Sequence, residues 1–343
     1  MKTTELIQSI CSLMSINGYE YTDSEKLEEI VLPYFDECVR DNVGNHIFIK
    51  RCGRENAKKL FIDTHFDEIG LMVKDITEEG FLRVCSVGGV DARLLPGAEL
   101  VVYGNGKSLK AIAFDKPDCI RKDDERGKLT QVTDIMLDTG LDKIEVSKCV
   151  NIGTPVGFAP VYGELENGYF FGKSLDDKLC AVSVIRAIEM VDKEKLCFDV
   201  YFSMSSREEV GHRAVSTGAF RTEPDAAIVI DVTFGLSPDG KKGSEMKMGG
   251  GAVVSHAAIL NKKLTRAIID TAKEKELPYQ ICVEGVGTGT HADDVAFVGR
   301  GIPTALLSVP IWFMHTPVET TCIDDVENTA KLLCALLEKE DLI

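Results

Sequence analysis

The chain has 343 residues, of which 44% are hydrophobic and 27% are charged, and its formal net charge at pH 7 is −16. These values are ordinary for a folded globular protein, and the length is sufficient for one large domain with a smaller one. The negative charge, with no stripe of lysine or arginine, argues against nucleic acid as a partner. No apolar run is long enough to span a membrane, so we expect no membrane partner either.

The eleven cysteines are dispersed along the chain, and no two of them have the spacing C-x-x-C. Such a set is typical of reduced thiols in the core of an intracellular protein rather than of a disulfide framework. The first residues begin a helix-like pattern rather than a signal peptide. Together these observations predict a cytoplasmic protein.

The first 35 residues have apolar positions at helical spacing, and Gly18 separates two such stretches. Strands are predicted at residues 46–50 and 60–63, and the second of them leads directly into His65. The first candidate functional side chain is therefore expected at the end of a strand.

Residues 74–162 contain short β-type runs separated by turns, and Asn105-Gly106 between two of them predicts a hairpin. None of the candidate metal ligands named below lies in this region. We therefore expect a β-rich domain at 74–162, inserted into a catalytic domain formed by residues 1–73 and 163–343.

After residue 165 the pattern alternates between helices and strands. Helices are predicted at 179–191, 264–272 and 326–337, and strands at 198–204 and 226–230. Alternation of this kind predicts an α/β sandwich, in which ligands bind beyond the carboxyl ends of the strands.

Side chains that bind divalent cations occur at or beside the ends of these predicted elements. Two imidazoles and three carboxylates are sufficient to hold two metal ions that share one carboxylate. These candidate metal ligands are His65, Asp176, Glu209, Asp231 and His315. Glu208, next to a ligand, is a candidate general base, and Asp67 is placed to accept the second ring N–H of His65.

Each of these residues also has a structural interpretation. Asp176 and Asp177 are suited to the start of a helix, Glu208 and Glu209 to a solvated surface, and a histidine such as His315 to a hydrogen bond with a core carbonyl. Their joint occurrence at element ends favours a metal site. His46, His212 and His256 lack such partners and are assigned structural or surface roles.

The sequence does not support a nucleotide-binding loop or a serine hydrolase. The glycine run 249–251 is not followed by the Lys-Ser/Thr of a phosphate-binding loop, and no G-x-S-x-G elbow surrounds the serines at 203–206.

The order of motifs resembles the TET-type, or glutamyl, aminopeptidase family of dinuclear co-catalytic zinc metallopeptidases. The motifs that carry the resemblance span most of the chain and are His65–Gly70, Leu175–Asp177, Glu208–Gly211, Asp231 and Met314–Pro317. The resemblance implies an α/β/α sandwich of the zinc aminopeptidase type with an inserted small β-barrel that is PDZ-like.

The resemblance also implies individual roles. Asp176 would bridge two divalent ions and join Asp177 through a cis peptide bond. His65 and Asp231 would complete one ion site, and Glu209 and His315 the other. Glu208 would be the general base, with Asp67 orienting His65. Zinc is the expected metal, with cobalt or manganese as alternatives.

Three positions depart from the usual pattern of the family: Arg207 before the Glu-Glu pair, His291 where relatives often have Asp, and Trp312 where relatives often have Arg. The expected activity is metal-dependent removal of N-terminal residues from short peptides by a homo-oligomer, a dimer or a dodecamer. The alternatives are a divergent amidohydrolase or deacylase, a glucan hydrolase, or a non-catalytic oligomeric binding protein.

Overall fold

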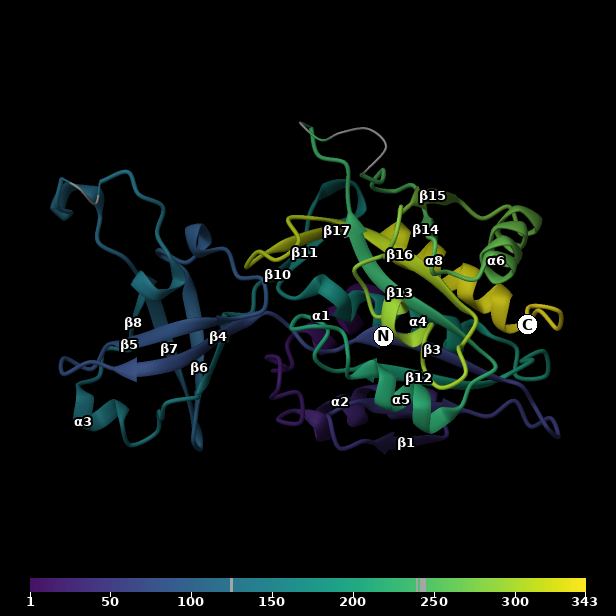
Figure 1. Cartoon of the computed structure of the whole chain (residues 1–343), viewed down its shortest axis with the longest axis horizontal. Coiled ribbons are helices and arrows are strands. Elements are labelled where there is room, and N and C mark those ends of the chain that lie inside the picture. Colours follow the sequence, from purple (N-terminus) through teal and green to yellow (C-terminus); the bar gives the residue numbers. More distant parts are fainter. Residues whose placement is uncertain (124–125, 239, 241–244) are drawn as a thin grey trace.

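The computed structural model describes residues 1–123, 126–238, 240 and 245–343. These residues form a large body of helices and strands beside a smaller body made of strands, the two joined by short segments (Figure 1). The predicted α/β/α sandwich with an inserted β-barrel is confirmed.

A mixed sheet runs through the large body. Its strands, in spatial order, are β1 (Glu37–Arg40), β2 (His46–Lys50), β12 (Asp199–Ser205), β3 (Lys59–His65), β13 (Ala226–Phe234), β16 (Thr304–Trp312), β17 (Glu319–Cys322), β11 (Tyr169–Gly172) and β10 (Tyr162–Glu164). Two further strands, β14 (Ala252–His256) and β15 (Tyr279–Val283), extend from β16. The neighbours β12, β3, β13 and β16 are parallel, so their carboxyl ends meet at one edge of the sheet.

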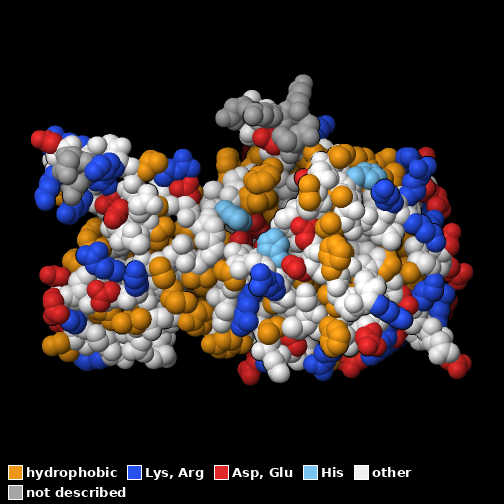
Figure 2. All heavy atoms as spheres, in the orientation of Figure 1, with side chains coloured by type: hydrophobic (Ala, Val, Ile, Leu, Met, Phe, Trp, Pro, Cys, Tyr) orange, Lys and Arg blue, Asp and Glu red, His pale blue; other side chains and the backbone are white. Residues whose placement is uncertain are grey.

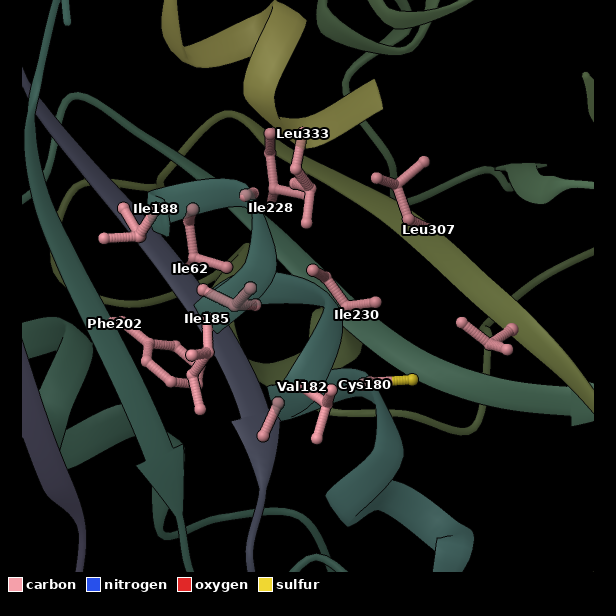
Figure 3. Close-up of a cluster of buried hydrophobic side chains, with 14 of the residues drawn as sticks. Ile62, Cys180, Val182, Ile185, Ile188, Phe202, Ile228, Ile230, Leu307 and Leu333 are labelled. Atoms are coloured by element: carbon pink, nitrogen blue, oxygen red, sulfur yellow. The ribbon is translucent and has the colours of Figure 1, made fainter. Parts of the chain in front are cut away.

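Helices cover both faces of this sheet. The larger core layer contains α1 (Thr3–Cys11), α2 (Ser24–Val31), α4 (Leu175–Met190), α6 (Lys262–Glu274) and α8 (Ile323–Leu337). The opposite layer contains α5 (Val215–Thr222) and α7 (Ala292–Val295). Figure 3 shows how α4 packs on the sheet, with Val182 and Ile185 of the helix beside Phe202 of β12 and Ile230 of β13. This packing buries the helix on most sides.

The smaller body is a closed barrel. Its strands, in spatial order, are β4 (Gly70–Ile76), β5 (Leu82–Val87), β8 (Met136–Asp138), β7 (Lys107–Phe114), β6 (Glu99–Gly104) and β9 (Pro155–Phe158), and it also carries α3 (Lys143–Val146). The predicted hairpin at Asn105-Gly106 is confirmed, since it joins β6 to β7 and Gly106 has a φ of +69°. The barrel has an apolar core of its own. Such a core allows it to act as a distinct unit.

Short 3-10 turns complete the regular structure: η1 (Leu32–Tyr34), η2 (Ala92–Leu94), η3 (Asp118–Ile120), η4 (Val132–Asp134) and η5 (Glu166–Gly168). Among the described residues, no helix combines the length and the apolar character that crossing a membrane requires.

A buried ionic cluster lies where the chain leaves the sandwich for the barrel. The Oε2 atom of Glu68, just before β4, accepts hydrogen bonds from Lys173, from Ser174 and, at 3.1 Å, from Lys178. Glu68, Lys173 and Lys178 are each at most 3% exposed. Burial alone would raise the pKa of Glu68, but the charges of the two lysines lower it to about 2. The cluster therefore joins the start of β4 to the segment that enters α4.

Candidate metal centre

The parallel strands bring the predicted metal ligands to one edge of the sheet. His65 is the last residue of β3 and pairs in register with Ser205, the last residue of β12. Asp231 lies on β13, two residues beyond the pairing of Val229 with Asp63. Glu209 follows β12 and His315 follows β16. This is the edge at which open α/β sheets bind ligands.

Asp176, at the start of α4, lies between the two imidazoles. Its Oδ1 atom is 2.9 Å from Nε2 of His65, and its Oδ2 atom is 3.5 Å from Nε2 of His315. Beyond them, Oδ1 of Asp231 is 3.9 Å from the His65 nitrogen, and Oε2 of Glu209 is 3.3 Å from the His315 nitrogen. All five predicted ligands therefore belong to one cluster, with one pair of donors on each side of Asp176.

These spacings are suited to metal coordination. Zinc binds imidazole nitrogen and carboxylate oxygen at about 2.0–2.2 Å in tetrahedral sites, which places neighbouring donor atoms about 3.4 Å apart. Donor atoms of His65, Asp176 and Glu209 all lie within 4.8 Å of one another, as do those of His65, Asp177 and Asp231. The donor types and their spacing therefore fit a divalent ion of the zinc type.

The electrostatics of the cluster also favour cations. Burial raises the pKa of Glu209 well above its ordinary value, and the charge of Asp176 raises it further. Burial likewise raises the pKa of Asp231 well above the ordinary value. Carboxylates that are close together and buried away from water repel one another unless protons or cations neutralise them.

Asp67 fixes the backbone that carries the candidate base. Its Oδ1 atom accepts the N–H of Glu208 at 3.0 Å, and its Oδ2 atom accepts the N–H of Glu209 at 3.1 Å. Nδ1 of His65 lies 3.0 Å from the main-chain oxygen of Asp67 and 3.6 Å from the carboxylate. In the structure the His65 ring is within hydrogen-bond distance of the main-chain oxygen of Asp67 rather than of the predicted carboxylate, which accepts the two glutamate N–H groups.

Sequence reasoning missed Glu319 and the anchoring contact of Asp177, two carboxylates that accept backbone N–H groups of the predicted ligands. Glu319, 2% exposed, accepts the N–H of Asp176 and the N–H of His315, each at 3.0 Å. Asp177 accepts the N–H of His65 at 3.1 Å, and its peptide bond with Asp176 is cis, as the resemblance implied. Burial and the charge of Asp176 raise the pKa of Glu319 to about 8. The available signal was a glutamate four residues after His315, at the start of a strand.

His212 requires a correction. No partner was predicted for it, but the structure places its Nε2 atom 3.6 Å from Oε1 of Glu208 and its ring edge-on to that of His291. His212 follows Glu208 by four residues in a tight turn, in which Gly211 and His212 both have positive φ. That turn folds the histidine back onto the glutamate. No periodic pattern indicates it.

Two of the three departures from the family pattern, His291 and Trp312, lie beside or on strands that lead to the predicted metal ligands. His291 is 1% exposed and bonds through Nδ1 to Asp63 at 2.8 Å and to Ser205 at 2.9 Å. It thus ties together the ends of β3 and β12. Trp312, the last residue of β16, stacks on Tyr169 with an interplanar angle of 8°.

Arg207, the third departure, precedes the candidate base. It is exposed, and its N–H donates to Glu20 at 3.3 Å. Figure 2 shows imidazole and acidic side chains at the surface between the barrel and the sandwich.

Two imidazoles and three carboxylates at the carboxyl edge of an α/β/α sandwich are a donor set that fits a metal-dependent hydrolase. A sequence model of the M42 glutamyl aminopeptidase family matches residues 44–332. The chain therefore belongs to the M42 family of metal-dependent aminopeptidases.

Individual relatives agree with this assignment. The lysyl aminopeptidase of Pyrococcus furiosus is 31% identical over 339 residues, covering 98% of this chain and 96% of the relative. An aminopeptidase structure from the archaeon Desulfurococcus kamchatkensis has a TM-score of 0.90 and 29% identity, covering 98% of this chain and 94% of the other. The TET1 peptidase of Pyrococcus horikoshii assembles into a tetrahedron or an octahedral shell. It has a TM-score of 0.85 and 30% identity, covering 98% of this chain and 99% of the other.

Proposed function

We propose that this aminopeptidase removes N-terminal residues from short peptides with two divalent ions and Glu208 as the general base. The observation that carries the proposal is the position of Asp176. Each of its two carboxylate oxygens faces a different histidine, and each histidine faces a further carboxylate. A carboxylate so placed is suited to bridging two ions.

The donor set divides into two sites around Asp176. His65 and Asp231 would hold one ion, and Glu209 and His315 the other. Asp177 is assigned to orienting His65, because its Oδ2 atom already accepts the His65 N–H. Zinc is the proposed metal, with cobalt or manganese as alternatives, since nitrogen and carboxylate ligands suit all three.

Glu208 is proposed to carry out the proton transfer. Such ions, when bound, supply Lewis acidity that lowers the pKa of water and polarises a carbonyl group. Glu208 is 8% exposed, precedes a proposed ligand, and has its backbone held by Asp67. Its carboxylate accepts the proton of the attacking water and then delivers it to the leaving amine.

An assay that compares substrate classes tests the proposed function. Aminoacyl-p-nitroanilides, N-acetyl amino acids and carboxymethylcellulose are offered to metal-free protein and to protein supplied with Zn²⁺, Co²⁺ or Mn²⁺. We expect metal-dependent release from the free-amine substrates only. Cleavage restricted to N-acetyl substrates would favour a deacylase, cleavage of the glucan would favour the glycosidase alternative, and no cleavage at all would favour a binding protein.

The inserted barrel is proposed to mediate assembly, with the homo-oligomer being a dimer or a dodecamer. The support is the shell-forming relative named above and the closed barrel that stands beside the sandwich (Figure 1). A mass of one subunit by light scattering would contradict it.

A cytoplasmic location is proposed because the dispersed cysteines are all free thiols in the structure.

A further inference from the structure

The side chain of His315 is more exposed to solvent than those of the other proposed ligands. Its side chain is 39% exposed, whereas those of Asp176, Glu209, Asp231 and His65 are at most 8% exposed. Its backbone has a φ of +61°, in the left-handed region, and its N–H is anchored by Glu319. A side chain this open needs a neighbour on its outer side if its ring is to stay directed at Asp176.

That neighbour comes from the inserted barrel. A Cβ atom placed on Gly89, in the loop after β5, would lie 2.6 Å from Nδ1 and 3.1 Å from Cε1 of His315. One placed on the preceding Gly88 would lie 3.4 Å from Cβ of Glu209. The diglycine loop of the barrel therefore packs directly against both ligands proposed for the same ion.

The backbone alone does not explain a glycine at position 89. Gly88 has a φ of +77°, which favours glycine whatever surrounds it, but Gly89 has no positive φ. An alanine at 89 is therefore compatible with the local backbone, and only the imidazole opposes it. The missing side chain at this position is explained by the close approach to His315.

We propose that the inserted barrel forms one wall of the metal site and that Gly89 is a positioning residue for His315. The inference rests on the proposed role of His315 as a ligand. Since the wall belongs to the barrel, loading of the ion held by Glu209 and His315 is linked to the placement of the barrel on the sandwich. Binding linkage is reciprocal. Displacing the barrel at this loop therefore weakens the binding of that ion, and binding of the ion in turn stabilises the position of the barrel on the sandwich.

The test is Gly89→Ala, with Gly285→Ala as the matched control. Gly285 also lacks a positive φ, and a Cβ atom there would meet nothing within 4 Å. Zinc stoichiometry and affinity are measured by elemental analysis and calorimetry on metal-stripped full-length protein. We expect the wild type and Gly285→Ala to bind two equivalents of zinc. In Gly89→Ala we expect the affinity for the second equivalent to be at least tenfold lower. Wild-type affinity for both ions in Gly89→Ala would overturn the inference.

A second background separates contact with His315 from general misfolding. In His315→Ala protein the imidazole is absent, so adding Gly89→Ala should leave the Tm of the metal-free protein unchanged, whereas it should lower the Tm in the wild-type background. An equal loss in both backgrounds would overturn the inference. Failure of the wild type to bind two ions would instead contradict the proposed function and leave the packing of Gly89 on His315 as a separate result.

Discussion

Glu208→Gln is expected to lower kcat by about 10²- to 10⁴-fold, the range typical for loss of a general base. Glutamine has nearly the same shape but cannot accept the proton of the attacking water. The hydrogen bond from the backbone of residue 208 to Asp67 is independent of this side chain, so the ligands should keep their positions. Steady-state kinetics on an aminoacyl-p-nitroanilide, together with zinc stoichiometry, measure the effect.

The matched control is Glu194→Gln, an exposed glutamate on the loop between α4 and β12. It should leave both kcat and zinc content unchanged. If Glu208→Gln retained more than a tenth of the wild-type kcat with two ions bound, Glu208 would not be the base. His212, whose Nε2 atom lies 3.6 Å from Glu208, would then be the next residue to replace.

The second large effect concerns stability. Glu68→Gln is expected to lower the free energy of unfolding by about 3–5 kcal/mol at pH 7, because it leaves the buried Lys173 and Lys178 without their carboxylate. Burial lowers the pKa of Lys178 even beside Glu68, so the charge of Lys178 depends on this carboxylate. Urea unfolding of metal-free protein measures the difference.

The same carboxylate gives a pH dependence with a definite sign. The folded pKa of Glu68 is about 2, below its ordinary value of 4.5, so its contribution to stability is fully present above about pH 4.5. That contribution is lost as the pH falls from about 4.5 toward 2. The difference in unfolding free energy between wild type and Glu68→Gln should therefore narrow over this range.

Glu99→Gln is the matched control, because Glu99 pairs with Lys110 at 2.7 Å on the exposed surface of the barrel. Exposed pairs of this kind contribute about 0–1 kcal/mol. A loss of less than about 1 kcal/mol for Glu68→Gln would mean that the ionic cluster at the domain junction does not stabilise the fold.

The sequence allowed the candidate ligands to be named because each has a local signal. In the sequence His65 ends an apolar strand, Asp231 follows another predicted at residues 226–230, and Asp176 begins an apolar helix. Alternating strands and helices then predict that such residues gather at one edge of a sheet. A β-rich insert was predictable for a similar reason, since short β runs and the Asn105-Gly106 turn are also local features, whereas its closure into a barrel was implied only by the resemblance to the family.

The contacts that position these ligands were not predictable, because they join residues distant in the sequence. Glu319 acts on Asp176 across 143 positions, and Gly89 approaches His315 from another body of the molecule. The contact between Asp67 and His65 differed from the predicted contact for a related reason. A His-x-Asp spacing does not reveal that the glutamate N–H groups after β12 engage the carboxylate.

Anomalous scattering from crystals grown with zinc tests most directly whether the Asp176 carboxylate bridges two ions. We expect two zinc peaks about 3.5–4 Å apart, with the carboxylate of Asp176 between them. One ion should lie against His65 and Asp231, and the other against Glu209 and His315. A single peak, or two peaks of which only one contacts Asp176, would contradict the proposed two-metal site.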